Sequence, residues 1–203
     1  MKLKTIFIVL SAVLFTYGAN AQKLIPGEKG KSYLEFLKGQ EKIKLAFVYD
    51  DMQVGKMTEE AYVAKKKEEY NEKEAGRGDK WEKMWVEDRS KRFSPKFKEL
   101  FNKYVENDGL SVDESYDDAK YTMTVKTTWT EPGYYIGISS KPALISGKIV
   151  FAETSNPEKA LAEIEFIKAP GNSMATWDTG ERIKESYAKL GKTLAQYLSK
   201  KVF

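Results

Sequence analysis

The sequence predicts an α+β fold, a mostly antiparallel sheet of about four to five strands with helices packed on one face. Two observations predict it. Helical spacing of apolar residues dominates residues 58–108 and returns from residue 178, whereas between these segments the apolar period is two. The resulting order of strand, helices, strands and helix is typical of α+β layers.

The first 21 residues have the parts of a cleavable secretion signal: Lys2 and Lys4, an apolar run, and the triplet Ala19-Asn20-Ala21. The apolar run is shorter than the roughly 20 residues of a membrane-spanning helix, so cleavage is favoured over an uncleaved anchor. The chain has no cysteine, which excludes lipid attachment at a lipobox thiol. We therefore expect residues 22–203 to form a single periplasmic or secreted domain with no transmembrane segment.

The composition excludes several kinds of chemistry. Because the 203 residues include no cysteine and no histidine, thiol catalysis, disulfides, Cys/His zinc sites and the Ser-His-Asp triad are excluded. Without Lys2 and Lys4, 32 basic side chains stand against 30 acidic ones, and lysines interleave with glutamates, so no nucleic-acid partner is expected. We expect no cofactor and no metal, and an enzyme would have to use carboxylates, lysine, tyrosine or serine.

The region before residue 58 predicts a strand and little else. Apolar side chains at Ile43, Leu45 and Phe47 alternate with smaller or polar ones, which predicts a strand over 42–49. The apolar patch at 33–37 predicts a brief helix before it.

The helical segment at 58–108 divides into three pieces. Residues 58–74 are rich in lysine and glutamate and predict a solvated helix that ends at Gly76-Arg77-Gly78. The second piece, 79–93, carries Trp81 and Trp85 one turn apart, a spacing that favours a core position over a binding groove.

The third helical piece has the clearest end signals. Ser94 is predicted as its N-cap and Pro95 as its first residue, and Gly109 stops it. Its apolar face is expected to pack against the sheet, and it consists of Phe97, Leu100, Phe101, Tyr104 and Val105.

Three strands are predicted after Gly109, over 121–129, 143–151 and 160–167, and they are expected to form an antiparallel meander. The last two are joined by a polar turn at 153–158 that contains Asn-Pro. The final helix begins at Asp178, which forms an Asp-x-x-Glu capping box with Glu181. Gly191 lies within its apolar stripe, and this position predicts a close approach to a neighbouring element.

Four short motifs resemble functional sites but fail in context. The segment Gly27–Ser32 lacks the first glycine and the preceding strand of a phosphate-binding loop. Asp178-Thr179-Gly180 matches the aspartic-protease triplet in a single copy, and the capping-box interpretation is favoured. The acidic run at 113–118 lacks the glycine and terminal glutamate of an EF-hand loop. Ser139-Ser140-Lys141 could supply a serine and a lysine base, but adjacency does not bring hydroxyl and amine together, so a polar loop end is favoured.

The aromatic residues around the loop T-E-P-G-Y-Y-I-G-I-S-S-K, at 130–141, give the strongest binding signal. Trp129, Tyr134, Tyr135 and Lys141 are the candidate ligand-binding residues, since consecutive tyrosines on a strand point to opposite faces. The loop is longer than the roughly 2 to 5 residues of a tight hairpin, so it is either an extension of the strands or a shaped loop. Extension of the strands is favoured.

The order of elements at 121–200 carries a resemblance. A strand, the Pro132-Gly133 loop, a strand, the Asn156-Pro157 turn, a strand and a helix opened by Asp-Thr-Gly follow one another. This order resembles uncharacterised secreted proteins of Gram-negative envelopes and, more distantly, the periplasmic α/β domains similar to the amino-terminal domain of TolB. The resemblance implies an envelope protein that acts by binding or assembly, and it carries over no site residues.

Three functions remain open from the sequence. The first is a non-catalytic binding or assembly module of the cell envelope, with an envelope protein or a glycan as its partner. The second is a glycan-binding protein that uses exposed aromatic residues. The third is a carboxylate-dependent hydrolase, which requires two acids that converge in a cleft.

Overall fold

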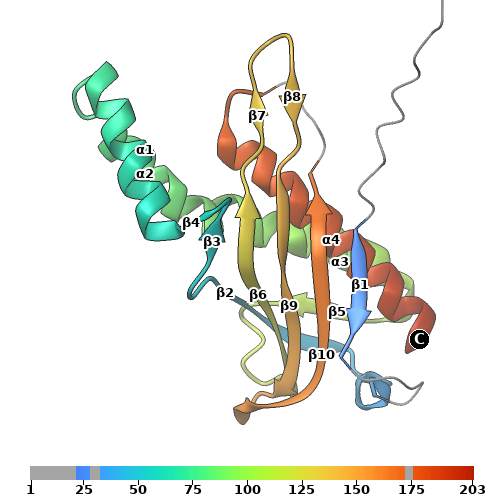
Figure 1. Cartoon of the computed structure of the whole chain (residues 1–203). Coiled ribbons are helices and arrows are strands. Elements are labelled where there is room, and N and C mark those ends of the chain that lie inside the picture. The colour runs from blue at the N-terminus through green and yellow to red at the C-terminus, as the bar shows by residue number, and fades with distance from the viewer. Residues whose placement is uncertain (1–21, 28–32, 172–175) are drawn as a thin grey trace, which may run out of the picture.

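The computed structural model describes residues 22–27, 33–171 and 176–203 (Figure 1). The predicted secretion signal at 1–21 lies outside the described residues, as does most of the Gly27–Ser32 motif.

An eight-stranded mixed sheet confirms the α+β class, with the order β1-β10-β9-β6-β2-β5 and with β3 and β4 attached beside β6. Its strand number exceeds the prediction because several strands are only two to four residues long, too short to show a period. β2 also runs parallel to both β5 and β6, so the sheet is mixed. The strands are β1 (Lys23–Pro26), β2 (Lys42–Val48), β3 (Gln53–Val54), β4 (Met57–Thr58), β5 (Ser111–Asp113), β6 (Tyr121–Glu131), β9 (Leu144–Glu153) and β10 (Asn156–Pro170).

The predicted meander is formed by β6, β9 and β10, which pair antiparallel. Val125, Ile149 and Ile164 are cross-strand partners in adjacent strands, and all three are fully buried. The turn between β9 and β10 is shorter than the predicted one at 153–158, because Asn156 already pairs with Glu153. Pro157 lies in a register shift of β10, where a residue without an N–H breaks no ladder hydrogen bond.

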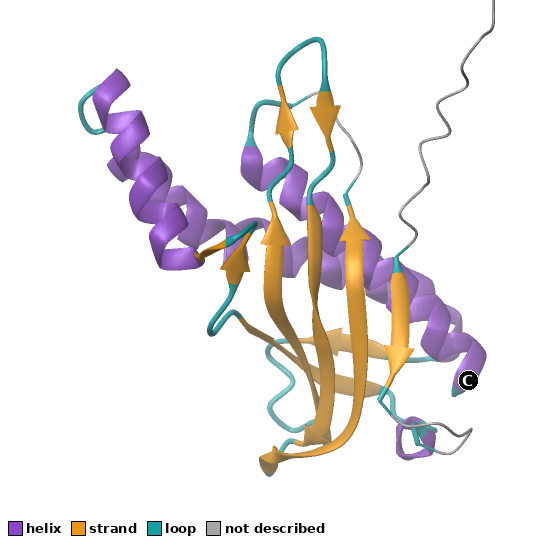
Figure 2. Cartoon of the chain, viewed as in Figure 1, coloured by secondary structure: helices purple, strands orange, loops and turns teal. Residues whose placement is uncertain are grey.

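Two long helices, α3 (Ser94–Val105) and α4 (Thr179–Lys201), pack on one face of this sheet (Figure 2). Gly191 lies where the two helices meet, and a Cβ added there would lie 2.4 Å from the carbonyl oxygen of Phe97. The predicted close approach is therefore confirmed. Phe97, Tyr187 and Leu194 are among the buried residues of the single hydrophobic cluster below these helices.

The predicted solvated helix and its neighbour form a helical arm, α1 (Glu59–Lys73) and α2 (Arg77–Asp88), that projects from the sheet (Figure 1). The structure describes every residue of α1, and none is buried. Thr58 caps α1 by accepting a hydrogen bond from the Ala61 N–H, and Gly76 takes a left-handed φ of 77° between the helices. The close packing of the arm requires Gly78, because a Cβ there would lie 2.0 Å from the Lys67 carbonyl oxygen.

A π-helical turn, η2 (Arg89–Phe93), joins α2 to α3 without a break, so the prediction that Ser94 is an N-cap is wrong. Ser94 has helical angles and donates its N–H to the Arg89 carbonyl. Pro95 has no N–H and its ring would clash with a carbonyl four residues earlier, and the wider turn relieves both problems. Two short 3-10 turns, η1 (Glu35–Leu37) and η3 (Glu106–Asp108), complete the helices, and Gly109 ends the second with a φ of 71°.

The loop at 130–141 is an extension of the strands, as favoured from the sequence. β7 (Tyr134–Tyr135) and β8 (Ser140–Lys141) pair as a separate two-stranded sheet beyond β6 and β9 (Figure 1). The Ile136 N–H donates to the Ser139 carbonyl at 3.0 Å and closes the turn at its tip. Gly133 is required at its base, because a Cβ there would lie 2.2 Å from the Lys141 carbonyl oxygen.

Candidate functional site

A cleft of about 380 Å³ lies between the helical arm and the start of α4. Its lining combines aromatic and sulfur-containing side chains with two basic and two acidic ones, and we refer to it as the aromatic cleft. The lining residues are Tyr70, Arg77, Lys80, Trp81, Met84, Trp85, Asp88, Trp177, Asp178, Thr179 and Gly180.

The wall on the helical arm is built from aromatic residues at helical spacing. Trp81 and Trp85 lie one turn apart on α2, with ring centroids 5.5 Å apart. Trp85 is buried and donates its indole N–H to Glu59 at 2.6 Å, whereas Trp81 is half-buried and contacts Tyr70. The two tryptophans therefore serve both as packing residues and as part of the cleft wall.

The opposite wall begins at Trp177, whose side chain is 71% exposed. Its ring contacts Tyr135 of the β7–β8 hairpin edge to face, with centroids 5.0 Å apart. Asp178 follows as the N-cap of α4 and accepts a hydrogen bond from the Glu181 N–H, which confirms the predicted cap. The reciprocal bond of a capping box is not formed, because the Asp178 N–H donates to the Thr176 hydroxyl and the Glu181 carboxylate bonds Lys184. Trp177 connects the aromatic cleft to the hairpin.

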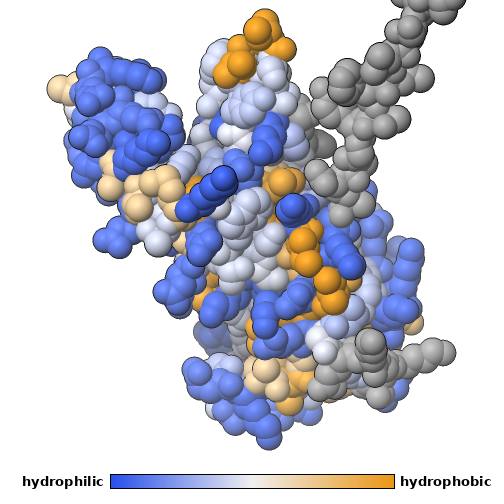
Figure 3. All heavy atoms as spheres, in the orientation of Figure 1, coloured by the Kyte–Doolittle hydropathy of each residue, from blue (hydrophilic) through white to orange (hydrophobic). Residues whose placement is uncertain are grey.

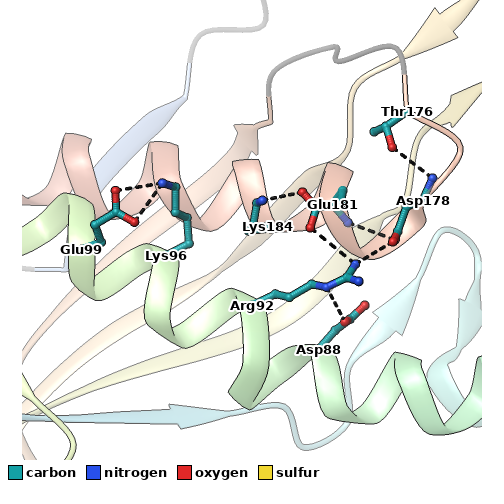
Figure 4. A network of polar contacts seen from close by, with 8 residues as sticks. All are labelled: Asp88, Arg92, Lys96, Glu99, Thr176, Asp178, Glu181 and Lys184. Atoms are coloured by element: carbon teal, nitrogen blue, oxygen red, sulfur yellow. Dashed lines mark hydrogen bonds and ion pairs between the residues drawn. The ribbon is translucent and has the colours of Figure 1, made fainter.

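An ion-pair network joins the two acids of the cleft lining, Asp88 and Asp178, through Arg92 (Figure 4). Arg92 of the π-turn pairs through Nε with Asp88 at 3.1 Å and through Nη1 with Asp178 at 2.8 Å. Glu181 lies farther away, at 3.7 Å from Nη1. Asp88 also packs tightly on α4, because a Cβ on Gly180 would lie 1.8 Å from its Oδ2. Two carboxylates thus converge on the cleft, each held by the same guanidinium.

The two acids have opposite pKa shifts. Burial raises the pKa of Asp88 to about 6, even though the charge of Arg92 acts in the other direction. Burial also acts to raise the pKa of Asp178, but hydrogen bonds from Arg92 and from the Glu181 N–H outweigh it and leave that pKa lowered. At neutral pH both groups are ionised, and Asp88 is the one that takes up a proton first as the pH falls.

Arg182 fastens the start of α4 to the base of the hairpin. Its buried guanidinium donates to the carbonyls of Pro132 at 3.1 Å and Thr176 at 2.8 Å, and to the Thr179 hydroxyl at 3.0 Å. No carboxylate of the described residues forms an ion pair with it. Because Pro132 precedes the hairpin and Thr176 precedes Trp177, Arg182 positions both sides of the Trp177–Tyr135 contact.

No protein-family model matches the chain, and no curated protein matches it. Among solved structures, the chain is similar to the PelC dodecamer from Paraburkholderia phytofirmans, with 10% sequence identity and a TM-score of 0.38. The match covers 90% of this chain and 100% of the PelC chain. This likeness is too low to indicate a shared function.

Three of the four site residues predicted from the sequence lie together on the β7–β8 hairpin, where Tyr134 and Lys141 are cross-strand partners and Tyr135 is adjacent. None of the four lines the aromatic cleft. Trp129 is half-buried and donates its indole N–H to the Gly55 carbonyl at 2.8 Å, away from the cleft lining. Tyr134 is exposed and Tyr135 half-buried on the hairpin, and only Tyr135 touches a cleft residue, Trp177. Lys141 pairs with Glu131 at 3.4 Å.

The remaining motifs have structural partners. The acidic run at 113–118 forms ion pairs with lysines on neighbouring elements, including Asp113 with Lys98 at 2.8 Å. The Tyr134 hydroxyl lies 3.3 Å from the Ser139 hydroxyl, while Lys141 is engaged by Glu131. Within the described ranges no group of acidic side chains could hold a metal ion, and no helix there is long and apolar enough to cross a membrane.

Sequence reasoning missed Trp177 as a site residue. It considered this segment only through the aspartic-protease triplet that follows it. A tryptophan directly before a helix cap could have drawn attention to this position. An apolar residue there usually packs on the first turns of the helix, and one that does not is exposed. Met84 was also missed, although it is 44% exposed in the cleft wall.

Proposed function

We propose that the protein is a non-catalytic binding module of the bacterial cell envelope, and that the aromatic cleft is its ligand site. The observation that carries this proposal is the lining of the cleft, where exposed Met84 lies with the basic residues Arg77 and Lys80 on α2, and exposed Trp177 lies before α4. A concave surface with apolar walls and a few polar groups is the usual form of a ligand site. The predicted secretion signal and the resemblance of residues 121–200 to envelope proteins support a location in the periplasm or outside the cell.

The engagement of the two cleft acids supports binding over catalysis. Asp178 uses Oδ1 to cap α4 and Oδ2 to pair with Arg92. Asp88 pairs with Arg92 through Oδ1, and its Oδ2 packs against Gly180. A general acid or base must reach the substrate with a free oxygen, and here every carboxylate oxygen already has a structural contact. A carboxylate-dependent hydrolase therefore remains the weaker proposal, although two acids do converge.

A glycan is the ligand class that this lining supports best. The half-buried ring of Trp81 and the exposed ring of Trp177 offer apolar faces, while Arg77, Lys80 and Thr179 offer donors for hydroxyl or carboxylate groups. Amphipathic ligands that are apolar on one face and rich in hydroxyls at the edge satisfy both requirements. The two basic residues favour an acidic glycan, since they have no counterpart acid that is free in the cleft.

Site-directed photo-crosslinking tests the binding proposal. A photoreactive amino acid at Met84, in the cleft, is expected to capture envelope protein or glycan in whole envelope extracts. The matched control places the same amino acid at Lys148, on the outer face of the sheet, where little capture is expected. Equal capture at both positions, or none at Met84, would contradict the proposal.

A glycan array separates the ligand classes. Glycans bound by the wild-type protein are expected to lose at least about tenfold in affinity with Arg77→Ala, because a charged hydrogen bond is lost. Absence of any glycan signal above background would leave a protein ligand. If the wild-type protein cleaves glycans of the array and Asp88→Asn does not, the hydrolase is supported instead.

A further inference from the structure

The tip of the β7–β8 hairpin is apolar and exposed. Ile138 is 97% exposed and Ile136 is 55% exposed, on a two-stranded extension beyond the main sheet. Figure 3 shows the apolar tip standing above a largely hydrophilic neighbourhood. Full exposure of a large aliphatic side chain forgoes the free energy of burying it, so two such residues at a projecting turn indicate a contact surface.

The side chains behind the tip follow a definite order along the hairpin. Ile136 and Ile138 form the turn, and Tyr134, Tyr135 and Trp177 lie next to it. Lys141 lies level with Tyr134, its cross-strand partner, and it pairs with Glu131, which lies nearer the sheet. Aliphatic residues at the tip, followed by tyrosine, tryptophan and lysine, match a membrane interface. There aliphatic side chains lie in the hydrocarbon, and aromatic and lysine side chains lie at the headgroups.

We propose that this hairpin inserts its tip into the surface of a lipid bilayer, with Tyr134 and Trp177 at the level of the headgroups. A protein partner fits less well, because a specific protein interface needs about 20 to 30 residues a side, and the tip offers only a few. Glu131 offsets the charge of Lys141, so apolar insertion rather than attraction to anionic lipid drives the contact. Such an insertion is weak and reversible.

Sedimentation with vesicles tests the proposal. The exported, purified protein is expected to bind pure phosphatidylcholine vesicles and vesicles of phosphatidylethanolamine with phosphatidylglycerol about equally, with little dependence on salt. The double variant Ile136→Ser and Ile138→Ser is expected to lower the partition coefficient at least about tenfold. Each comparison is made between proteins with the same N-terminus, so any contribution of that end cancels.

Ile167→Ser provides the matched control, because Ile167 is an exposed isoleucine of β10 that lies outside the hairpin. It is expected to bind vesicles as the wild type does. Brominated lipids then report depth: bromines near the headgroups should quench the fluorescence of Trp177 more strongly than bromines deep in the chains, and Trp177→Phe identifies its share of the signal.

Two results would overturn the proposal. One is unchanged vesicle binding by the double variant, and the other is no binding of either vesicle type by the wild type. A photoreactive amino acid at Ile138 that captures an envelope protein in the absence of vesicle binding would assign the tip to a protein partner. In the absence of glycan, Arg77→Ala is expected to bind vesicles as the wild type does, so the cleft and the tip are tested separately.

Discussion

Arg92 joins two parts of the molecule that are distant in the sequence. It belongs to the π-turn between α2 and α3, and it ion-pairs with Asp88 on its own helix and with Asp178 at the start of α4. The cleft wall therefore depends on a charge network and not only on apolar packing. Within that network the ionised form of Asp88 is disfavoured, because burial raises its pKa to about 6.

Asp88→Asn is expected to change how stability depends on pH. The folded-state pKa of about 6 lies above the ordinary value of 3.8, so ionisation of Asp88 costs stability as the pH rises between these values. The free energy of unfolding of the wild type should therefore fall relative to that of Asp88→Asn between about pH 4 and pH 7, by about 1 to 2 kcal/mol after solvent screening. Urea denaturation followed by tryptophan fluorescence measures it.

Asp113→Asn is the control with the opposite sign. Hydrogen bonds from Lys98 and Ser115 lower the pKa of Asp113 to about 2. Its contribution to stability is present above its ordinary value of 3.8 and is lost as the pH falls toward 2. Parallel pH profiles for Asp88→Asn and the wild type would show that the ionised Asp88 carries no penalty.

At the scale of elements, the packing of α4 on α3 depends on the absence of a side chain at residue 191. The Phe97 carbonyl occupies the space where a Cβ would stand, at 2.4 Å. Backbone atoms of two packed helices cannot move apart without opening the core beneath them, which includes the fully buried Phe97 and Leu194.

Gly191→Ala is expected to destabilise the protein by about 1 to 3 kcal/mol through overpacking, although alanine gains about 1 kcal/mol in helix propensity. Chemical denaturation measures the difference. Gln196→Ala serves as the control, because Gln196 is exposed on the same helix and its replacement changes propensity alone. A Gly191→Ala variant as stable as the wild type would mean that the helices separate freely.

The sequence predicts those elements whose signal is local. The N-cap at Asp178 and the period-two run of β6 each depend only on residues close together in the sequence, and both are confirmed. The parallel pairing of β2 with β6 is not predictable in this way, because it depends on a partner far along the chain. The π-turn was missed because Ser94-Pro95 carries the same local signal as a helix start.

The candidate site was less predictable than the fold. The helical spacing of Trp81 and Trp85 favours core positions, and the structure places them both in packing and in a cleft wall. Whether Trp177 is exposed depends on how the segment before α4 meets the hairpin, and Arg182 sets this through contacts with Pro132 and Thr176. No periodicity in the sequence encodes such a contact.

At the scale of the whole molecule, the helical arm and the β7–β8 hairpin both project away from the sheet and its packed helices (Figure 1). Every residue of α1 is described and none is buried, whereas α3 buries Phe97, Phe101 and Val105 completely. Figure 3 shows the arm as largely hydrophilic. Local stability should therefore differ strongly between these parts.

Native-state hydrogen exchange is expected to give α1 the lowest opening free energy of the long helices, with the strands β6, β9 and β10 near the global value. Mass spectrometry of peptides from α1 and α3 compares the two directly. The physical reason is that opening α1 exposes little buried apolar surface. Protection of α1 equal to that of α3 would contradict the assignment of the arm as a locally unstable unit.

The buried guanidinium of Arg182 has a consequence for the two proposed surfaces. It is bonded to the Pro132 carbonyl at the base of the hairpin and, through Thr176 and Thr179, to the rim of the cleft. A change in backbone position at the base of the hairpin therefore shifts the rim of the cleft, and a change at the rim shifts the hairpin. Lipid contact and cleft occupancy would then be thermodynamically linked. If membrane binding changes the affinity for the cleft ligand by some factor, the ligand changes the affinity for the membrane by the same factor.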